Sequence, residues 1–174
     1  MNVRRLTAAV CAVLLTVSLL LTACGQETPV TPVGTESAVS GEAPAAAPKD
    51  IREIAAALNA DCAFSESLTE NDGYLAKMFP QLDGAFADCA AYVPAGIVPE
   101  EIFVFKAASE GDVEKITSVL KDYAAQQTDD YSDYAPAQVP KLEGYVLSWE
   151  NDLVVYVVSC DNASAAKTAA ELLK

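Results

Sequence analysis

The sequence contains no histidine. Histidine is the commonest general base near neutral pH and a frequent zinc ligand, so its absence excludes His-assisted serine or cysteine triads, imidazole bases and His-ligated zinc. Basic residues are also scarce, with 11 Lys and Arg against 25 Asp and Glu and a net charge of −14. Such a surface repels phosphate backbones, and no basic stripe offsets it, so we expect no nucleic-acid partner.

The sequence also lacks any Cys-x-x-Cys pair, the spacing typical of zinc sites and thioredoxin-like redox centres. Of its five cysteines, Cys11 lies within the N-terminal apolar run and Cys24 directly follows it, which leaves Cys62, Cys89 and Cys160. Three cysteines allow at most one disulfide, which an exported protein can form. We expect free buried thiols that pack as small hydrophobic groups, and no cofactor.

Residues 1–23 are typical of a secretory signal sequence. Arg4 and Arg5 supply a positive start, and Leu6 to Ala23 is an uncharged run rich in Leu, Val and Ala. An uncleaved membrane-spanning helix is the alternative, because the run approaches the roughly 20 apolar residues that cross a bilayer. Both interpretations place the rest of the chain outside the cytoplasm, at the cell membrane.

Leu21-Thr22-Ala23-Cys24 favours the cleaved signal, because it resembles the lipobox of bacterial lipoproteins. The resemblance implies that the thiol of Cys24 receives a diacylglycerol and that the chain is cut just before it. Two acyl chains suffice for stable anchoring. Residues 24–49, rich in Pro, Thr, Ala, Gly, Ser and Glu, are expected to form a disordered linker that spans roughly 25–30 Å.

Residues 50–174 predict a single small α+β domain, in which helices cover a mostly antiparallel sheet of about four strands. Helices are predicted over 50–60, 71–79, 112–127, 136–142 and, capped by Asp161 or Asn162, to residue 173. Strands are predicted over 86–93, 102–106, 145–149 and 153–158. The strand 102–106 is apolar on both faces and should be central. Asn151 and Asp152 suit the tight turn of a closing hairpin.

Three sequence features resemble lipoproteins of Gram-positive anaerobes that share a domain of unknown function, number 4358. They are Glu100-Glu101-Ile102-Phe103-Val104-Phe105-Lys106, a helix ending at Gln126-Gln127, and Tyr131-x-x-Tyr134-x-Pro136 ahead of Leu142. The resemblance implies an α+β fold and a location at the membrane. It brings no catalytic residues.

One set of motifs partly matches the penicillin-recognising serine enzymes. Ser118-x-x-Lys121 fits the nucleophile motif, while Ser132-Asp133 and Lys167-Thr168 fit half of the two motifs that follow it. However, Ser118 and Lys121 lie opposite the apolar stripe of their predicted helix, and Lys167 falls in a helix where those enzymes have a strand. We therefore expect no catalytic site here.

Acidic side chains offer only weak candidates for a site. Asp129, Asp130 and Asp133 fall in a predicted acidic loop, 128–134, and could provide oxygen ligands for calcium, but the EF-hand pattern is missing. A solvated loop is the simpler expectation. Glu100 and Glu101 are expected to precede the central strand. Because adjacent strand residues point to opposite faces, they should not share one carboxylate site.

Tyr145, Leu147 and Trp149 are predicted to share one strand face. Such a face could bind a sugar or peptide, but core packing is the simpler expectation. Taken together, the sequence predicts a lipid-anchored, extracytoplasmic and non-catalytic binding or envelope-interaction module. The alternative is an envelope hydrolase that uses carboxylates or a metal.

Overall fold

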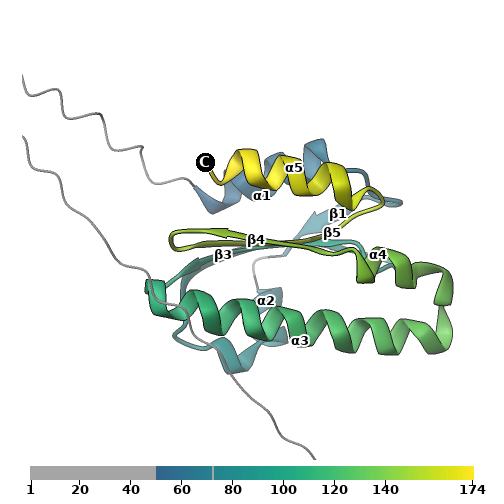
Figure 1. The fold of residues 1–174 in the computed structure, drawn as a ribbon, viewed down its shortest axis with the longest axis horizontal. Coiled ribbons are helices and arrows are strands. Elements are labelled where there is room, and N and C mark those ends of the chain that lie inside the picture. Colours follow the sequence, from purple (N-terminus) through teal and green to yellow (C-terminus); the bar gives the residue numbers. More distant parts are fainter. Residues whose placement is uncertain (1–49, 72) are drawn as a thin grey trace, which may run out of the picture. The chain divides into compact units, whose positions relative to one another are not determined.

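The computed structural model of the protein describes residues 50–71 and 73–174. The predicted signal sequence 1–23, Cys24 and the linker 24–49 lie outside the described residues. The described chain forms an antiparallel sheet with helices on both faces (Figure 1), which confirms the predicted α+β class. No helix in this part of the chain is long and apolar enough to span a bilayer.

The sheet has five strands, and every neighbouring pair is antiparallel. Their order across the sheet is β1 (Leu68–Glu70), β2 (Phe86–Pro94), β3 (Glu101–Ala107), β5 (Leu153–Val158) and β4 (Val146–Glu150). β3 is the middle strand, as its apolar pattern predicted. β1 was not predicted, because a three-residue edge strand is too short to show an alternating pattern.

One face of the sheet is covered by α1 (Ile51–Asp61) and α5 (Asn162–Leu172) (Figure 1). The side chain of Asp50 accepts a hydrogen bond from the Arg52 N–H, and that of Asp161 accepts one from the Ser164 N–H. Both residues therefore act as N-caps, as predicted. Apolar side chains from both helices pack onto the even-numbered residues of β3.

The other face is covered by α2 (Tyr74–Met78) and the long helix α3 (Glu110–Tyr134) (Figure 1). Here the aromatic rings of Phe103, Phe105 and Tyr156 project from the sheet. They pack against the apolar stripe of α3 that begins at Val113 and against Phe79. The central strand thus contributes to two separate cores, one on each side of the sheet.

The predicted acidic loop 128–134 is wrong, because α3 continues to Tyr134. Tyr131 is buried and packs these last turns of the helix against the core. The hydroxyls of Thr128 and Ser132 donate to the carbonyls of Ala124 and Thr128, four residues earlier, and add local support. After α3, the helix predicted over 136–142 divides into a 3₁₀ turn, Pro136–Gln138, and α4 (Val139–Glu143).

The predicted hairpin forms between β4 and β5, and Asn151 takes the positive φ of 52° that its turn requires. Tyr145 precedes β4 and packs against Tyr156, and Leu147 also contacts the core. Trp149 is half exposed on the edge strand β4. The predicted core packing is therefore confirmed for Tyr145 and Leu147 and wrong for Trp149, whose position has no strand beyond it.

Candidate binding pocket around Glu101

A cavity of about 380 Å³ lies between the sheet and α3, at the end of the sheet where β3 begins. We call it the Glu101 pocket. It is formed by the start of α2, the connection between β2 and β3, and the C-terminal half of α3. Its lining residues are Asn71, Tyr74, Val93, Pro94, Gly96, Ile97, Val98, Pro99, Glu101, Tyr123, Gln127 and Tyr131.

Glu101 forms the floor of this pocket. As the first residue of β3 it pairs with Val158 and points to the same side as Phe103 and Phe105, so its side chain is only 6% exposed. The Tyr123 hydroxyl donates a hydrogen bond of 3.2 Å to its Oε2. Within the described chain Glu101 forms no ion pair.

Burial dominates the ionisation of Glu101. Removal from water raises the pKa of its carboxyl to about 8, although the hydrogen bond from Tyr123 acts in the opposite direction. At pH 7 the group is therefore mostly protonated. The pocket thus contains a neutral carboxylic acid that a change in its surroundings can ionise.

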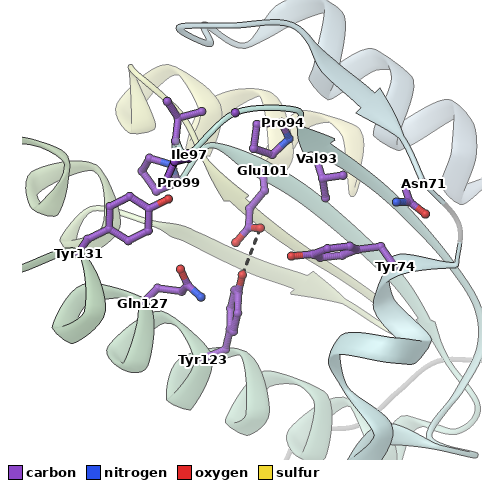
Figure 2. Close-up of a pocket in the computed structure, with 12 residues that line it drawn as sticks. Asn71, Tyr74, Val93, Pro94, Ile97, Pro99, Glu101, Tyr123, Gln127 and Tyr131 are labelled. Atoms are coloured by element: carbon purple, nitrogen blue, oxygen red, sulfur yellow. Dashed lines mark hydrogen bonds between the residues drawn. The ribbon is translucent and has the colours of Figure 1, made fainter. Parts of the chain in front are cut away.

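Three tyrosine side chains line the pocket around this carboxyl. The Tyr123 hydroxyl reaches it from below, and Figure 2 shows the Tyr74 hydroxyl directed toward it from one side, while the Tyr131 hydroxyl lies on the other side and points toward Pro99. Burial is the main cause that raises the pKa of all three phenols, and the nearby charge of Glu101 raises them further. They therefore remain neutral and can both donate and accept hydrogen bonds.

The remaining walls combine apolar and amide groups. Pro94 ends β2, Ile97 and Pro99 come from the β2–β3 connection, and Gln127 and Asn71 present side-chain amides (Figure 2). Most of the exposed lining is polar, and the apolar residues are confined to one wall, so the pocket suits a polar rather than a greasy ligand. The geometry can therefore orient a small polar ligand against Glu101.

Glu100, the preceding residue, points away from the pocket. It is fully buried and accepts hydrogen bonds from Ser65, Lys141 and Cys160. Burial alone would raise the pKa of Glu100, but these donors and the charge of Lys141 outweigh it and lower the pKa. The two adjacent glutamates thus face opposite ways, as expected from strand geometry, and differ in ionisation.

The structure does not bring the other candidate residues into this pocket. Asp129, Asp130 and Asp133 lie exposed on the last turns of α3, where the Gln126 amide donates to Asp130. Across the described residues, no three or more carboxylate or thiol groups are arranged to share a metal ion. Ser118 and Lys121 are exposed on α3, as predicted from their position opposite its apolar stripe.

Of the three described cysteines, Cys62 and Cys160 are free thiols. Cys89 is buried, as expected, and Cys62 is half-buried. Cys160 departs from the expected buried thiol, because it is exposed and its Sγ donates to Glu100 Oε1 at 3.2 Å. It lies just after β5, where the chain leaves the core for the N-cap of α5.

The pocket itself was missed by sequence reasoning, which treated Glu101 as a residue that only precedes a strand. The available signal was its position: Glu101 shares the parity of Phe103 and Phe105 in a strand that is apolar on both faces. Tyr131 similarly continues the helical spacing of Leu120 and Ala124. A charged residue at a core-facing strand position is a site candidate by its placement alone.

The fold and pocket define a small α+β domain with a ligand-sized cavity on its α3 side. The sequence model of a domain of unknown function, DUF4358, matches residues 71–159, and the chain belongs to this family. The match runs from the start of the pocket to the end of β5, so it includes every pocket-lining residue. No curated protein and no solved structure matches the chain.

Proposed function

We propose that the protein is a lipid-anchored, extracytoplasmic binding module that holds a small ligand in the Glu101 pocket. The observation that carries this proposal is a buried carboxyl, without a charged partner in the described chain, that opens into a tyrosine-lined cavity. Burying an ionisable group in this way costs stability. Such a cost is characteristic of groups that contact a ligand.

The geometry supports binding over carboxylate-based hydrolysis. A pair of cooperating carboxylates must flank the same bond, but among the described residues Glu101 is the only acidic one that lines this pocket. Its neighbour Glu100 points away and is held by Lys141 and Ser65. Neither the family match nor the pocket points to a hydrolase, and we propose no catalytic step.

The lipid anchor rests on the sequence. Arg4 and Arg5, the apolar run and the lipobox ending at Cys24 support export, cleavage and lipidation. The acidic domain would be repelled by anionic headgroups, so the lipid on Cys24 and the linker 24–49 would provide the membrane contact. In this arrangement the pocket samples the space just outside the membrane.

Ligand capture is tested by thermal unfolding of the full chain in mild detergent, against a panel of wall fragments, sugars, amines and peptides. A ligand at about 100 times its dissociation constant stabilises the folded state by about 2.7 kcal/mol, which raises Tm by several degrees at this size. The shift should disappear in Glu101→Gln and persist in Glu53→Gln. The control makes the same change of charge on the exposed face of α1. No shift with any compound would contradict the proposal.

Anchoring is tested separately in a Gram-positive host. The wild-type chain should fractionate with the membrane and incorporate labelled fatty acid. Cys24→Ser should abolish the labelling, while Cys11→Ser, which changes a cysteine inside the signal, should not. Labelled protein in the Cys24→Ser strain would show that the lipid is attached elsewhere or that another anchor operates.

A further inference from the structure

We infer that the ligand of the Glu101 pocket carries a protonated primary amine, and that its ammonium group binds between Glu101 and the surrounding tyrosine hydroxyls. This inference rests on the proposed function and specifies the chemistry of its ligand. The pocket would therefore recognise amino sugars, amino acids, polyamines or lysine side chains by a single shared group.

The first argument is the kind of atom that converges in the pocket. Glu101 supplies two carboxyl oxygens, and Figure 2 shows the hydroxyl oxygens of Tyr74 and Tyr123 next to it and that of Tyr131 on the opposite wall of the pocket, beside Pro99. The Gln127 amide adds a further oxygen. An ammonium group has three N–H donors and no acceptor, so it matches a cluster of oxygen acceptors. The hydroxyls rather than the ring faces point inward, which favours a hydrogen-bonding ammonium over a quaternary one.

The second argument is the missing counter-charge. The other fully buried carboxyl, Glu100, has its own cation in Lys141, whereas Glu101 has none in the described chain. No lysine or arginine among the described residues lines the pocket. The net charge of −14 raises the local concentration of small cations around the protein and repels anions. An external cation is thus the partner that this carboxyl lacks.

Ammonium binding should be coupled to proton release. In the empty pocket Glu101 is mostly protonated at pH 7; an adjacent ammonium stabilises the carboxylate, so the acid gives its proton to solvent as the cation binds. In the described chain, the other titratable groups that face Glu101 are Tyr74 on α2, Tyr123 and Tyr131 on α3 and Tyr156 on β5. Their raised pKa values keep these phenols protonated.

Glu100, although adjacent in sequence, stays ionised because its pKa is lowered. Among the described titratable groups that line the pocket, Glu101 is the one whose pKa lies near neutral pH. The released proton therefore reports on one side chain.

The experiment is isothermal titration of the full chain in detergent with n-butylammonium chloride, 1-butanol and tetramethylammonium chloride at constant ionic strength. 1-Butanol is a neutral compound of similar size, and tetramethylammonium is a cation without N–H donors. Titrations in buffers with different ionisation enthalpies give the number of protons released. We expect n-butylammonium to bind and to release close to one proton at pH 7, falling toward none above pH 9. Its affinity should rise about tenfold per pH unit below pH 8 and then level off.

Variants locate the coupling at one residue. Glu101→Gln should lose the proton release and at least tenfold in affinity, while Glu53→Gln should match the wild type. Tyr123→Phe keeps the carboxyl but removes its hydrogen-bonding hydroxyl, so proton release should persist with weaker binding. Circular dichroism at the titration temperature confirms that each variant is folded.

Several results would overturn the inference. Equal binding of 1-butanol without proton release would show a neutral ligand site, which leaves the proposed binding function intact. Equal binding of tetramethylammonium would show that N–H donation is irrelevant. Absence of n-butylammonium binding would reject the amine class. If the thermal panel also gave no shift, the proposed function would fail with it.

Discussion

Glu100 and Glu101 differ more in their surroundings than any other adjacent pair of acidic residues in the described chain. β3 directs Glu101 toward α3, where it contacts Tyr123, while Glu100 turns to Ser65 and Lys141. One carboxyl is ionised and paired, and the other is protonated and open to a cavity. Structural support and ligand contact are thus divided between two neighbouring side chains.

Glu101 should make the folded state less stable as pH rises. Because its pKa is about 8 in the folded state and ordinarily 4.5, the folded chain binds more protons between these values. The contribution of Glu101 to the free energy of unfolding is therefore fully present below pH 4.5 and is lost as pH rises through 8. The total loss is at most about 5 kcal/mol. Urea unfolding of wild type and Glu101→Gln from pH 5 to 9 should show a difference that grows in favour of Glu101→Gln. A pH-independent difference would contradict this.

Lys141 should be required for the stability of the fold, because Glu100 is a buried charge. The Lys141 side chain is 23% exposed and that of Glu100 is fully buried, so Lys141→Met leaves a buried charge without its partner. Loss of one partner of a buried pair costs about 3–5 kcal/mol. The cost should shrink as pH falls, since Glu100, whose pKa is lowered by the pair, then becomes protonated. Adding Glu100→Gln should restore most of the stability, and a double variant as unstable as Lys141→Met would refute the role of the ion pair.

Tyr156 and Tyr123 provide a matched pair of hydroxyl deletions. The Tyr156 hydroxyl is buried and has no hydrogen-bond partner in the described chain, whereas that of Tyr123 donates to Glu101. Tyr156→Phe should therefore be neutral or stabilising by about 1 kcal/mol, and Tyr123→Phe should destabilise by about 1 kcal/mol. Chemical denaturation measures both. A loss of stability in Tyr156→Phe would contradict this, because it would mean that the Tyr156 hydroxyl does form a hydrogen bond.

At the scale of elements, α3 contributes both to the hydrophobic core and to the wall of the pocket. Its N-terminal half packs Ile116 and Leu120 onto the sheet, and its C-terminal half carries Tyr123, Gln127 and Tyr131 into the pocket. The last two turns carry three exposed aspartates, which a helix C-terminus disfavours. Burial of Tyr131 compensates for this unfavourable charge.

Tyr131→Ala should therefore loosen the end of α3. Replacing a large buried ring with a methyl group costs about 3 kcal/mol or more, and hydrogen exchange of amides 128–134 should speed up more than that of amides 112–120. Tyr134, which is 56% exposed on the same turn, is the control, and Tyr134→Ala should change stability by less than about 1 kcal/mol. Similar effects of both substitutions would contradict the anchoring role of Tyr131.

The elements were largely predictable because they follow local rules. The apolar run of 102–106 predicted the central strand, and Asp50 and Asp161 predicted two helix starts that their hydrogen bonds confirm. The end of α3 was missed because its aspartates resemble a loop, and the contact that keeps it helical is made with distant parts of the chain. The pocket was not predicted for the same reason. Glu101, Tyr74 and Tyr123 are distant in sequence and come together only in the folded chain.

At the scale of the molecule, the sheet separates two cores with different roles. The α1 and α5 side is a plain apolar layer, while the α3 side includes the aromatic cluster and the Glu101 pocket. The DUF4358 match covers residues 71–159, so it contains the pocket side and leaves out α1 and α5. The domain family and the proposed binding site thus coincide along the chain.

The most direct measurement is an NMR titration of the Glu101 carboxyl carbon, made with and without n-butylammonium. The account predicts a pKa near 8 in the empty pocket, set by burial, and a pKa well below neutrality when the ammonium is bound. Glu53, exposed on α1, provides an internal reference in the same spectra. A Glu101 pKa near the ordinary 4.5 in both states would contradict a buried, uncompensated carboxyl and with it the proposed amine site.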